Sequence, residues 1–269
     1  MELDSSSGVS TRRVAAAVAG KPADAAVVRA AVDAARARGA GLDLIHVAAS
    51  VSTGGWMPAA IPEAVALGRR VLGRAVRDAH RDAPDLEVTG TLRTCAVVSD
   101  LVDASRGLPL LVVGREGRRG WSRAVLGPVT TALAAHAMCP VRVVPPARPE
   151  PSGPVVVAVF DVDGAERLVV HAALATPRGA RLLVHHRPEG LTRWGAVADL
   201  LAAARTARPD IVVEAVVDPR DRSESLLDLS VGASLVVVGR RRGVLGERLG
   251  RTTRRLLDHA YAPVEVVPA

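Results

Sequence analysis

The chain has few of the residues on which several common protein classes depend. Only 2% of its 269 residues are aromatic, which disfavours single-stranded nucleic acid as a partner, because such strands stack their bases on aromatic side chains. Two cysteines, Cys95 and Cys139, are too few for a disulfide framework and fit a reducing compartment. No apolar run could cross a bilayer, and residues 1–7 are too polar for a signal peptide. We therefore expect a cytoplasmic protein that makes no membrane contact.

Lysine is nearly absent as well. Lys21 is the only lysine among 35 basic residues, and with 28 acidic residues the net charge is +7. A basic protein of this kind can bind nucleic acid or anionic surfaces. Paired surface charges and an Ala- and Arg-rich codon bias explain the same composition, so nucleic acid is the disfavoured partner.

Motifs for catalysis or metal binding are also missing. The chain shows no P-loop, no GxGxxG and no Ser/His/Asp arrangement. Among seven histidines only His185 and His186 are adjacent, and neighbours on a strand point to opposite faces, which is poor for chelation. His46 and His185 match across the two halves of the chain and indicate shared packing. We expect no metal site and no enzymatic activity.

The most informative feature that the chain does contain is a segment present twice. A Val-rich strand runs into a glycine loop, a helix start and a final strand at 111–145, and the same order returns at 236–268. Strands alternate with helices in both halves, which predicts parallel pairing with helices on both faces of the sheet. In the first half we expect strands over 13–19, 42–47, 86–94, 108–113 and 141–144, helices over 22–38, 62–81, 99–105 and 129–137, and a loop over 50–60. In the second half we expect strands over 155–160, 181–185, 211–217, 235–238 and 264–267, and helices over 164–176, 191–207, 222–230 and 252–259.

The repeated segment carries a family resemblance. A strand, then Gly-x2-Gly-x9-Gly, a helix, and a Cys-Pro-Val-x-Val-Val strand resembles the universal stress protein family, over 12–145 and again over 154–268, on either side of a proline-rich linker. The resemblance implies two Rossmann-like lobes of the adenine nucleotide alpha hydrolase type, each a five-stranded parallel sheet. Family members commonly dimerise through the last strand. We therefore expect Val141–Val144 and Val264–Val267 to pair antiparallel, so that the lobes form an internal pseudo-dimer.

Many family members bind ATP, so the resemblance also implies a nucleotide site, with Mg²⁺ if ATP is bound. Ligands of such folds sit at the carboxyl ends of the strands, where the strand order switches. The candidate residues follow the first, second and fourth strands of the first half and begin its last helix. They are Ala19, Gly20, Val47, Val113, Gly114, Gly117, Gly127, Pro128, Val129 and Thr130.

The chain departs from the family pattern at this site. Ala19 stands where ATP-binding members have Asp, and Pro128 where they have Ser or Thr, which removes a hydroxyl and a backbone N–H from a phosphate-binding helix start. Thr130 is expected to compensate in part. In the second half Phe160 takes the Asp position and Arg251 the Ser/Thr position, so we expect no ATP there.

Arginines crowd both glycine loops, and two interpretations are equally open: anion capture by guanidinium forks, or ordinary solvated loops. These arginines are Arg115, Arg118, Arg119 and Arg123 in the first loop, and Arg240, Arg241, Arg242, Arg248 and Arg251 in the second. The leading functional hypothesis is a non-enzymatic stress-response protein that holds ATP or another adenylate weakly in its first lobe. The alternative is a nucleotide-free interaction module; a hydrolase has only the fold in its favour. The protein partner and any further homodimer stay open.

Overall fold

The computed structural model describes residues 13–48, 62–115, 126–146, 153–160, 164–187, 194–240, 242–243, 246–247 and 249–268. The predicted loop over 50–60 and the middle of the proline-rich linker lie outside these ranges, as does Gly117 of the candidate site. Arg118, Arg119, Arg123, Arg241 and Arg248 fall outside them too.

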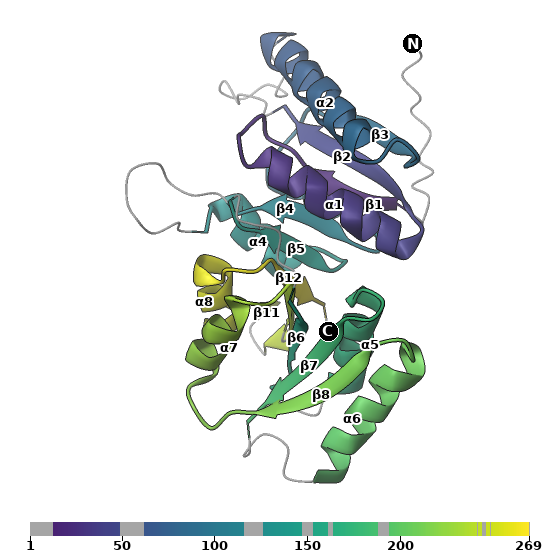
Figure 1. The fold of residues 1–269 in the computed structure, drawn as a ribbon. Coiled ribbons are helices and arrows are strands. Elements are labelled where there is room, and N and C mark those ends of the chain that lie inside the picture. The colour runs from purple at the N-terminus through teal and green to yellow at the C-terminus, as the bar shows by residue number, and fades with distance from the viewer. Residues whose placement is uncertain are drawn as a thin grey trace.

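The alternation of strands and helices is as predicted in both halves (Figure 1). The first half contains β1 (Arg13–Ala17), α1 (Asp24–Arg38), β2 (Gly41–Val47), α2 (Pro62–Asp82), β3 (Val88–Arg93), α3 (Val97–Ala104), β4 (Leu111–Gly114), α4 (Pro128–His136) and β5 (Val141–Val144). The second contains β6 (Val155–Ala158), α5 (Ala165–Ala175), β7 (Arg181–His186), α6 (Trp194–Ala207), β8 (Val212–Val217), α7 (Arg222–Ser230), β9 (Leu235–Gly239), β10 (Arg242–Gly243), β11 (Gly246–Glu247), α8 (Arg251–His259) and β12 (Val264–Val267). The short β10–β11 hairpin was not predicted.

Several boundaries differ from the prediction for local reasons. The first strand ends at Ala17 instead of residue 19, because the chain turns at Gly20, which has a φ of 74°. Helix α1 ends as predicted at a glycine: Gly39 adopts a left-handed conformation (φ 58°) and its N–H donates to Arg36 O. The fourth strand begins at Leu111 and not at residue 108.

Ten strands form one sheet in the order β3-β2-β1-β4-β5-β12-β9-β6-β7-β8. The five strands of each half run parallel to one another. Strands β5 and β12 are antiparallel neighbours at the centre, so the predicted pairing of Val141–Val144 with Val264–Val267 is confirmed. The two five-stranded sheets are therefore continuous (Figure 1).

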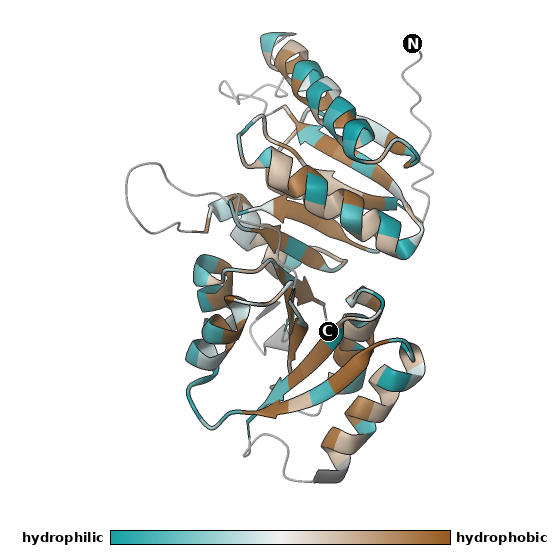
Figure 2. Ribbon diagram, viewed as in Figure 1, coloured by the Kyte–Doolittle hydropathy of each residue, from teal (hydrophilic) through white to brown (hydrophobic). Residues whose placement is uncertain are grey.

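Helices cover both faces of this sheet. On one face, α3, α4, α7 and α8 contribute to a single core that crosses the seam between the halves, with Leu133 and Leu256 both fully buried in it. On the other face, α1 and α2 cover a core of the first half, and α5 and α6 cover a core of the second. These cores consist mainly of Ala, Val and Leu side chains. Figure 2 shows the strands of the sheet as mostly hydrophobic.

The seam between β5 and β12 contains a buried ionic cluster. Glu265 on β12 has no exposed surface and lies directly opposite Arg142 on β5. Arg142 donates to Oε2 of Glu265 from both Nε and Nη2 at 2.7 Å. Nε2 of His171 on α5 contacts the other carboxylate oxygen, and Arg38 Nη2 lies 3.8 Å from it. Each half thus contributes charged groups to one cluster.

The cluster sets the ionisation of Glu265. Burial by itself raises the pKa of this carboxyl. The charge of Arg142, the contact with His171 and the charge of Arg38 together lower the pKa by more than burial raises it. The net effect is a pKa well below the ordinary value of 4.5, so Glu265 is ionised in the folded protein at neutral pH.

Replacing Glu265 tests what the cluster contributes. Glu265→Gln is expected to lower the free energy of unfolding by about 3 kcal/mol, because it leaves Arg142 buried without a counter-charge. The double variant Arg142→Leu with Glu265→Leu removes both charges and is expected to recover most of that loss. Urea denaturation of the two variants and the wild type measures both effects.

The same cluster predicts a pH dependence. Because the pKa of Glu265 is lowered by folding, its contribution to stability is fully present above about pH 4.5 and is lost as the pH falls below that value. Thermal denaturation of wild type and Glu265→Gln between about pH 6 and pH 3 should therefore show the difference between them shrinking with acid. A constant difference would contradict this assignment.

Candidate nucleotide site

The candidate site lies where the strand order reverses. Strands β1 and β4 are neighbours, and the chain leaves them toward opposite faces of the sheet, which is where ligands bind in folds of this type. Ala19 and Gly20 follow β1, Gly114 ends β4, and Gly127 immediately precedes α4. Three of the segments that the sequence singled out are thus brought to one edge of the sheet, and Val47 ends the neighbouring β2.

The candidate residues differ in how far they are accessible. Ala19, Gly20 and Pro128 are exposed, and Val129 is half-buried. Val113 is buried, and Val47 packs against the core shared by α3 and α4, so these two side chains support the site from below. The direct contacts available to a ligand here come mainly from the backbone.

A side-chain carboxylate of the protein itself occupies the turn after β1. Asp24 begins α1, and its carboxylate accepts hydrogen bonds from the backbone N–H groups of Gly20 at 2.7 Å, Ala19 at 3.0 Å and Lys21 at 3.2 Å. Successive backbone N–H groups of this kind form a nest that binds anions, and in this chain an internal carboxylate fills it.

Gly20 is required by this turn for two reasons. Its φ of 74° lies in the left-handed region that side chains rarely adopt. A Cβ at this position would also lie 2.9 Å from Cγ2 of Val71 on α2. The turn therefore brings backbone N–H groups to the edge of the sheet without a side chain in the way.

The start of α4 offers fewer donors than the family pattern. Gly127 is the N-cap in an extended conformation, and Pro128 occupies the first helical position, where it has no N–H to donate. Thr130, which was expected to compensate in part, has its hydroxyl engaged elsewhere. Its side chain is 3% exposed and its hydroxyl donates to Gly114 O at 3.1 Å, so this hydroxyl ties α4 to the end of β4.

The arginines directly after the two glycine strands have a structural role. Arg115 is 7% exposed and its Nη1 donates to Ala260 O at 2.9 Å and Leu257 O at 3.4 Å, at the C-terminus of α8 in the other half. Arg240 is equally buried, and its Nη1 donates to Ala137 O at 2.9 Å, at the C-terminus of α4. A cation at a helix C-terminus is favourable. For these two residues the anion-capture interpretation is therefore wrong.

The end of β6 in the second half differs from the family pattern. Phe160, at the position of the family's Asp, lies under the guanidinium of Arg222, whose Cζ is 5.4 Å from the ring centre. A groove of about 740 Å³ lies over the ends of β6 and β9, between α5 and Met138, and Phe160 and Leu168 are among its apolar lining residues. The apolar side chain of Phe160 therefore stands where the family pattern has an aspartate.

Behind this edge, His185 belongs to a buried polar chain. Its Nε2 lies 2.8 Å from Ser225 Oγ, which in turn donates to Asp218 Oδ2 at 2.6 Å. Burial lowers the pKa of His185, so the ring is neutral and Nε2 carries the hydrogen that Ser225 accepts. Ser225 lies on α7 and is fully buried, so these hydrogen bonds hold α7 against the sheet.

The predicted match of His46 with His185 is wrong by one residue. The backbone bonds from Val18 N to Ile45 O and from Val159 N to His185 O are equivalent in the two halves, so Ile45 corresponds to His185. His46 lies on the opposite face, where its ring approaches Gly68 of α2. Sequence matching missed this because the two adjacent histidines of β7 made either alignment acceptable.

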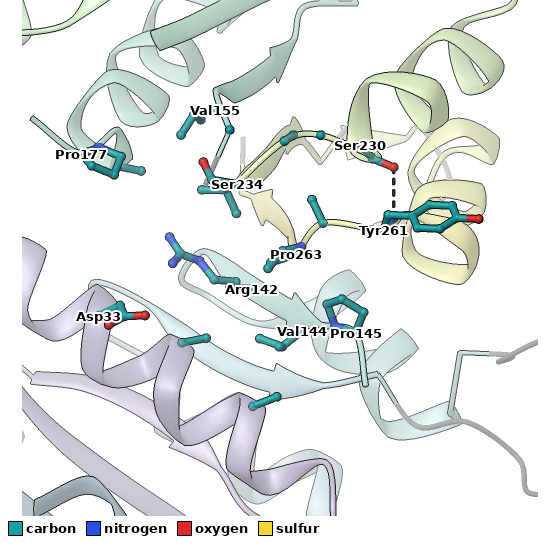
Figure 3. Close-up of a pocket in the computed structure, with 18 of the residues that line it drawn as sticks. Asp33, Arg142, Val144, Pro145, Val155, Pro177, Ser230, Ser234, Tyr261 and Pro263 are labelled. Carbon is teal, nitrogen blue, oxygen red and sulfur yellow. Dashed lines mark hydrogen bonds between the residues drawn. The ribbon is translucent and has the colours of Figure 1, made fainter. Parts of the chain in front are cut away.

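A second cavity, of about 730 Å³, lies elsewhere on the seam (Figure 3). It is enclosed by α1, the end of β5, and the starts of β6 and β9, with Asp33, Arg142 and Ser234 among its polar lining residues. Within this cavity, the backbone N–H of Tyr261 donates a hydrogen bond to the hydroxyl of Ser230 at 3.1 Å. Among the candidate nucleotide residues that the structure describes, none lines this cavity.

Metal and redox chemistry find no support in the described part of the chain. Among those residues no group of three or more His, Cys, Asp or Glu side chains could hold a metal ion. Burial raises the pKa of the Cys139 thiol to about 12, which makes it a poor nucleophile. No helix within the described ranges has the length and apolar content needed to span a bilayer.

Comparison with known proteins identifies the family. Residues 10–145 match the model of the universal stress protein family. One universal stress protein of Mycobacterium tuberculosis is 32% identical over 67% of this chain and 65% of its own length, so the alignment spans just under two thirds of that relative. Another from the same organism is 30% identical over 90% of this chain and 92% of its own length. The chain belongs to the universal stress protein family.

Solved structures agree on the fold. A universal stress protein from Archaeoglobus fulgidus superposes with a TM-score of 0.72 at 14% identity, covering 96% of this chain and 99% of the other. A putative universal stress protein from Pseudomonas aeruginosa gives a TM-score of 0.59 at 18% identity, covering 96% of this chain and 93% of the other. At these identities the likeness extends to the fold alone.

The hydrogen bonds that Arg115 and Arg240 make to the opposite half generate a stability prediction. Arg115→Met is expected to lower the free energy of unfolding by about 2 kcal/mol, because hydrogen bonds between charged donors and the carbonyls of α8 are lost. The exposed Arg106→Met is the matched control and is expected to change it by less than about 0.5 kcal/mol. Urea denaturation of both variants provides the comparison, and equal effects would contradict the capping role.

Proposed function

We propose that this member of the universal stress protein family is a non-enzymatic stress-response protein of the cytoplasm whose first half, residues 12–145, binds ATP or another adenine nucleotide weakly. The observation that supports the proposal is the arrangement of Gly20, Gly114 and Gly127 at the switch point between β1 and β4. We treat residues 154–268 as the second lobe of the pair, without a nucleotide.

The residues that would hold the nucleotide are few. The backbone N–H groups of Val129 and Thr130 belong to the first turn of α4, where a phosphate group is favoured by the helix dipole. Gly20 and Gly114 lie at the same edge of the sheet and present only backbone there, and Val47 borders the site on β2. Magnesium would neutralise phosphate charge, and its remaining ligands would be water, since Ala19 offers no carboxylate.

Three features make the binding weak. Pro128 supplies neither the hydroxyl nor the N–H of the family pattern. The hydroxyl of Thr130 is already bonded to Gly114 O. The carboxylate of Asp24 occupies the N–H groups after β1 and adds negative charge near the phosphates. Each lost hydrogen bond to a charged group costs about 1.5–3 kcal/mol, or roughly tenfold to a hundredfold in affinity.

One observation favours a second candidate function, a nucleotide-free interaction module with an unidentified protein partner. Asp24 fills the β1 turn so completely that all three N–H groups there are satisfied without a ligand. In this alternative the seam and the surface helices carry the function, and the glycine segments serve only the fold.

Calorimetric titration with Mg-ATP separates the two. We expect a Kd on the order of 1 mM for the wild type and at least about tenfold tighter binding for Pro128→Ser, which restores a hydroxyl and an N–H at the start of α4. Arg251→Ser at the same position in the second half is the matched control and should leave the affinity unchanged.

Other outcomes decide against parts of the proposal. If neither the wild type nor Pro128→Ser gives heat at millimolar nucleotide, the nucleotide proposal fails and the interaction module stands. ATP turnover clearly above that of a buffer blank would contradict a non-enzymatic role.

A further inference from the structure

Helix α2 presents a row of arginines on its outward face. Arg70, Arg74, Arg77 and Arg81 are spaced four, three and four residues apart, and all four are exposed. At 100° per residue they fall within about 60° of arc, and at 1.5 Å per residue they extend over roughly 16 Å along the helix. They therefore form a straight, narrow line of positive charge.

The row has little compensating charge. Asp78 pairs with Arg81 at 2.9 Å, while within the described residues no ion pair neutralises Arg70, Arg74 or Arg77. Glu63 lies on the same face, about two turns before Arg70. Like charges three and four residues apart on a helix repel one another, so the arrangement works against the stability of the helix itself.

The second half of the chain provides an internal control for this row. Helix α6 occupies the place of α2, packing against β8 and α5 as α2 packs against β3 and α1. Its exposed positions include Ala198, Ala202 and Thr206, with Asp199 and Arg205 as the exposed charged residues among its described side chains. Figure 2 shows more hydrophilic residues along α2 than along α6. Neither the fold nor the arginine-rich composition of the chain therefore requires the row.

We propose that the arginine row of α2 binds the phosphate backbone of duplex nucleic acid without regard to sequence. Arginine forks match phosphate oxygens, and phosphate contacts from arginine dominate non-specific binding to duplexes. The chain's shortage of aromatic residues excludes base stacking, which single strands need and duplexes do not.

Two other anionic partners fit the row less well. The apolar face of α2, with Leu72, Ala75 and Ala79, is buried against the sheet, so the helix cannot insert it into a lipid surface. An acidic protein surface would need a matching line of carboxylates. A duplex carries a charge every few ångströms along its axis, which suits a straight row of this length.

Binding of the full-length chain to a fluorescent 20-base-pair duplex, followed by anisotropy from about 25 to 200 mM salt, tests the proposal. Three unneutralised arginines predict a slope of log K against log salt of about −2.7. Arg70→Gln, Arg74→Gln and Arg77→Gln together should weaken binding at low salt at least about tenfold and bring the slope close to zero. Circular dichroism establishes that the variant is folded.

The control is a variant with the same loss of charge elsewhere. Arg29→Gln, Arg178→Gln and Arg254→Gln remove three exposed arginines scattered over both halves and should retain the steep slope. Equal losses in the two triple variants would overturn the proposal, because binding would then follow net charge alone. It is also overturned if anionic vesicles or polyglutamate bind through the row while the duplex does not.

Discussion

The antiparallel contact between β5 and β12 is the interaction on which the rest of this structure depends. It joins two five-stranded parallel sheets into one and places Arg142 and Glu265 opposite each other inside the protein. These residues occupy equivalent positions in the two halves. Paired with itself, either strand would place two like charges face to face in a buried position, which is strongly unfavourable. Opposite charges at equivalent positions thus favour pairing of the two different halves over pairing of like halves from separate chains.

The seam also organises what lies around it. Arg115 and Arg240 directly follow the two glycine-bearing strands and donate to carbonyls at the ends of the opposite helices, so the end of each strand is anchored to the other half. The backbone N–H of Leu126, just before α4, donates to Asp258 of α8 at 2.9 Å, which extends the contact to the edge of the candidate site. The candidate site of the first half is therefore shaped partly by residues of the second.

Sequence reasoning recovered the elements and the duplication from periodic patterns. It recovered the seam from the resemblance to a family whose members dimerise through the last strand. It did not recover contacts between distant residues. Nothing near Arg115 shows that it reaches Ala260, and nothing near Thr130 shows that its hydroxyl bonds to Gly114 O. The hydrogen bonds from three backbone N–H groups to Asp24 depend on how the turn at Gly20 closes. The sequence identified the segments that meet at the candidate site, but the hydrogen bonds that decide its chemistry depend on such contacts.

The central claim is that the seam makes the two halves one cooperative structure. Native-state hydrogen exchange of the β5 and β12 amides tests it most directly, since exchange reports the free energy of the opening that exposes each amide. The account predicts that these amides exchange only through global unfolding, with the same opening free energy as the amides of β4 and β9. Exchange of β5 and β12 through a lower-energy opening, with each half still protected, would contradict it.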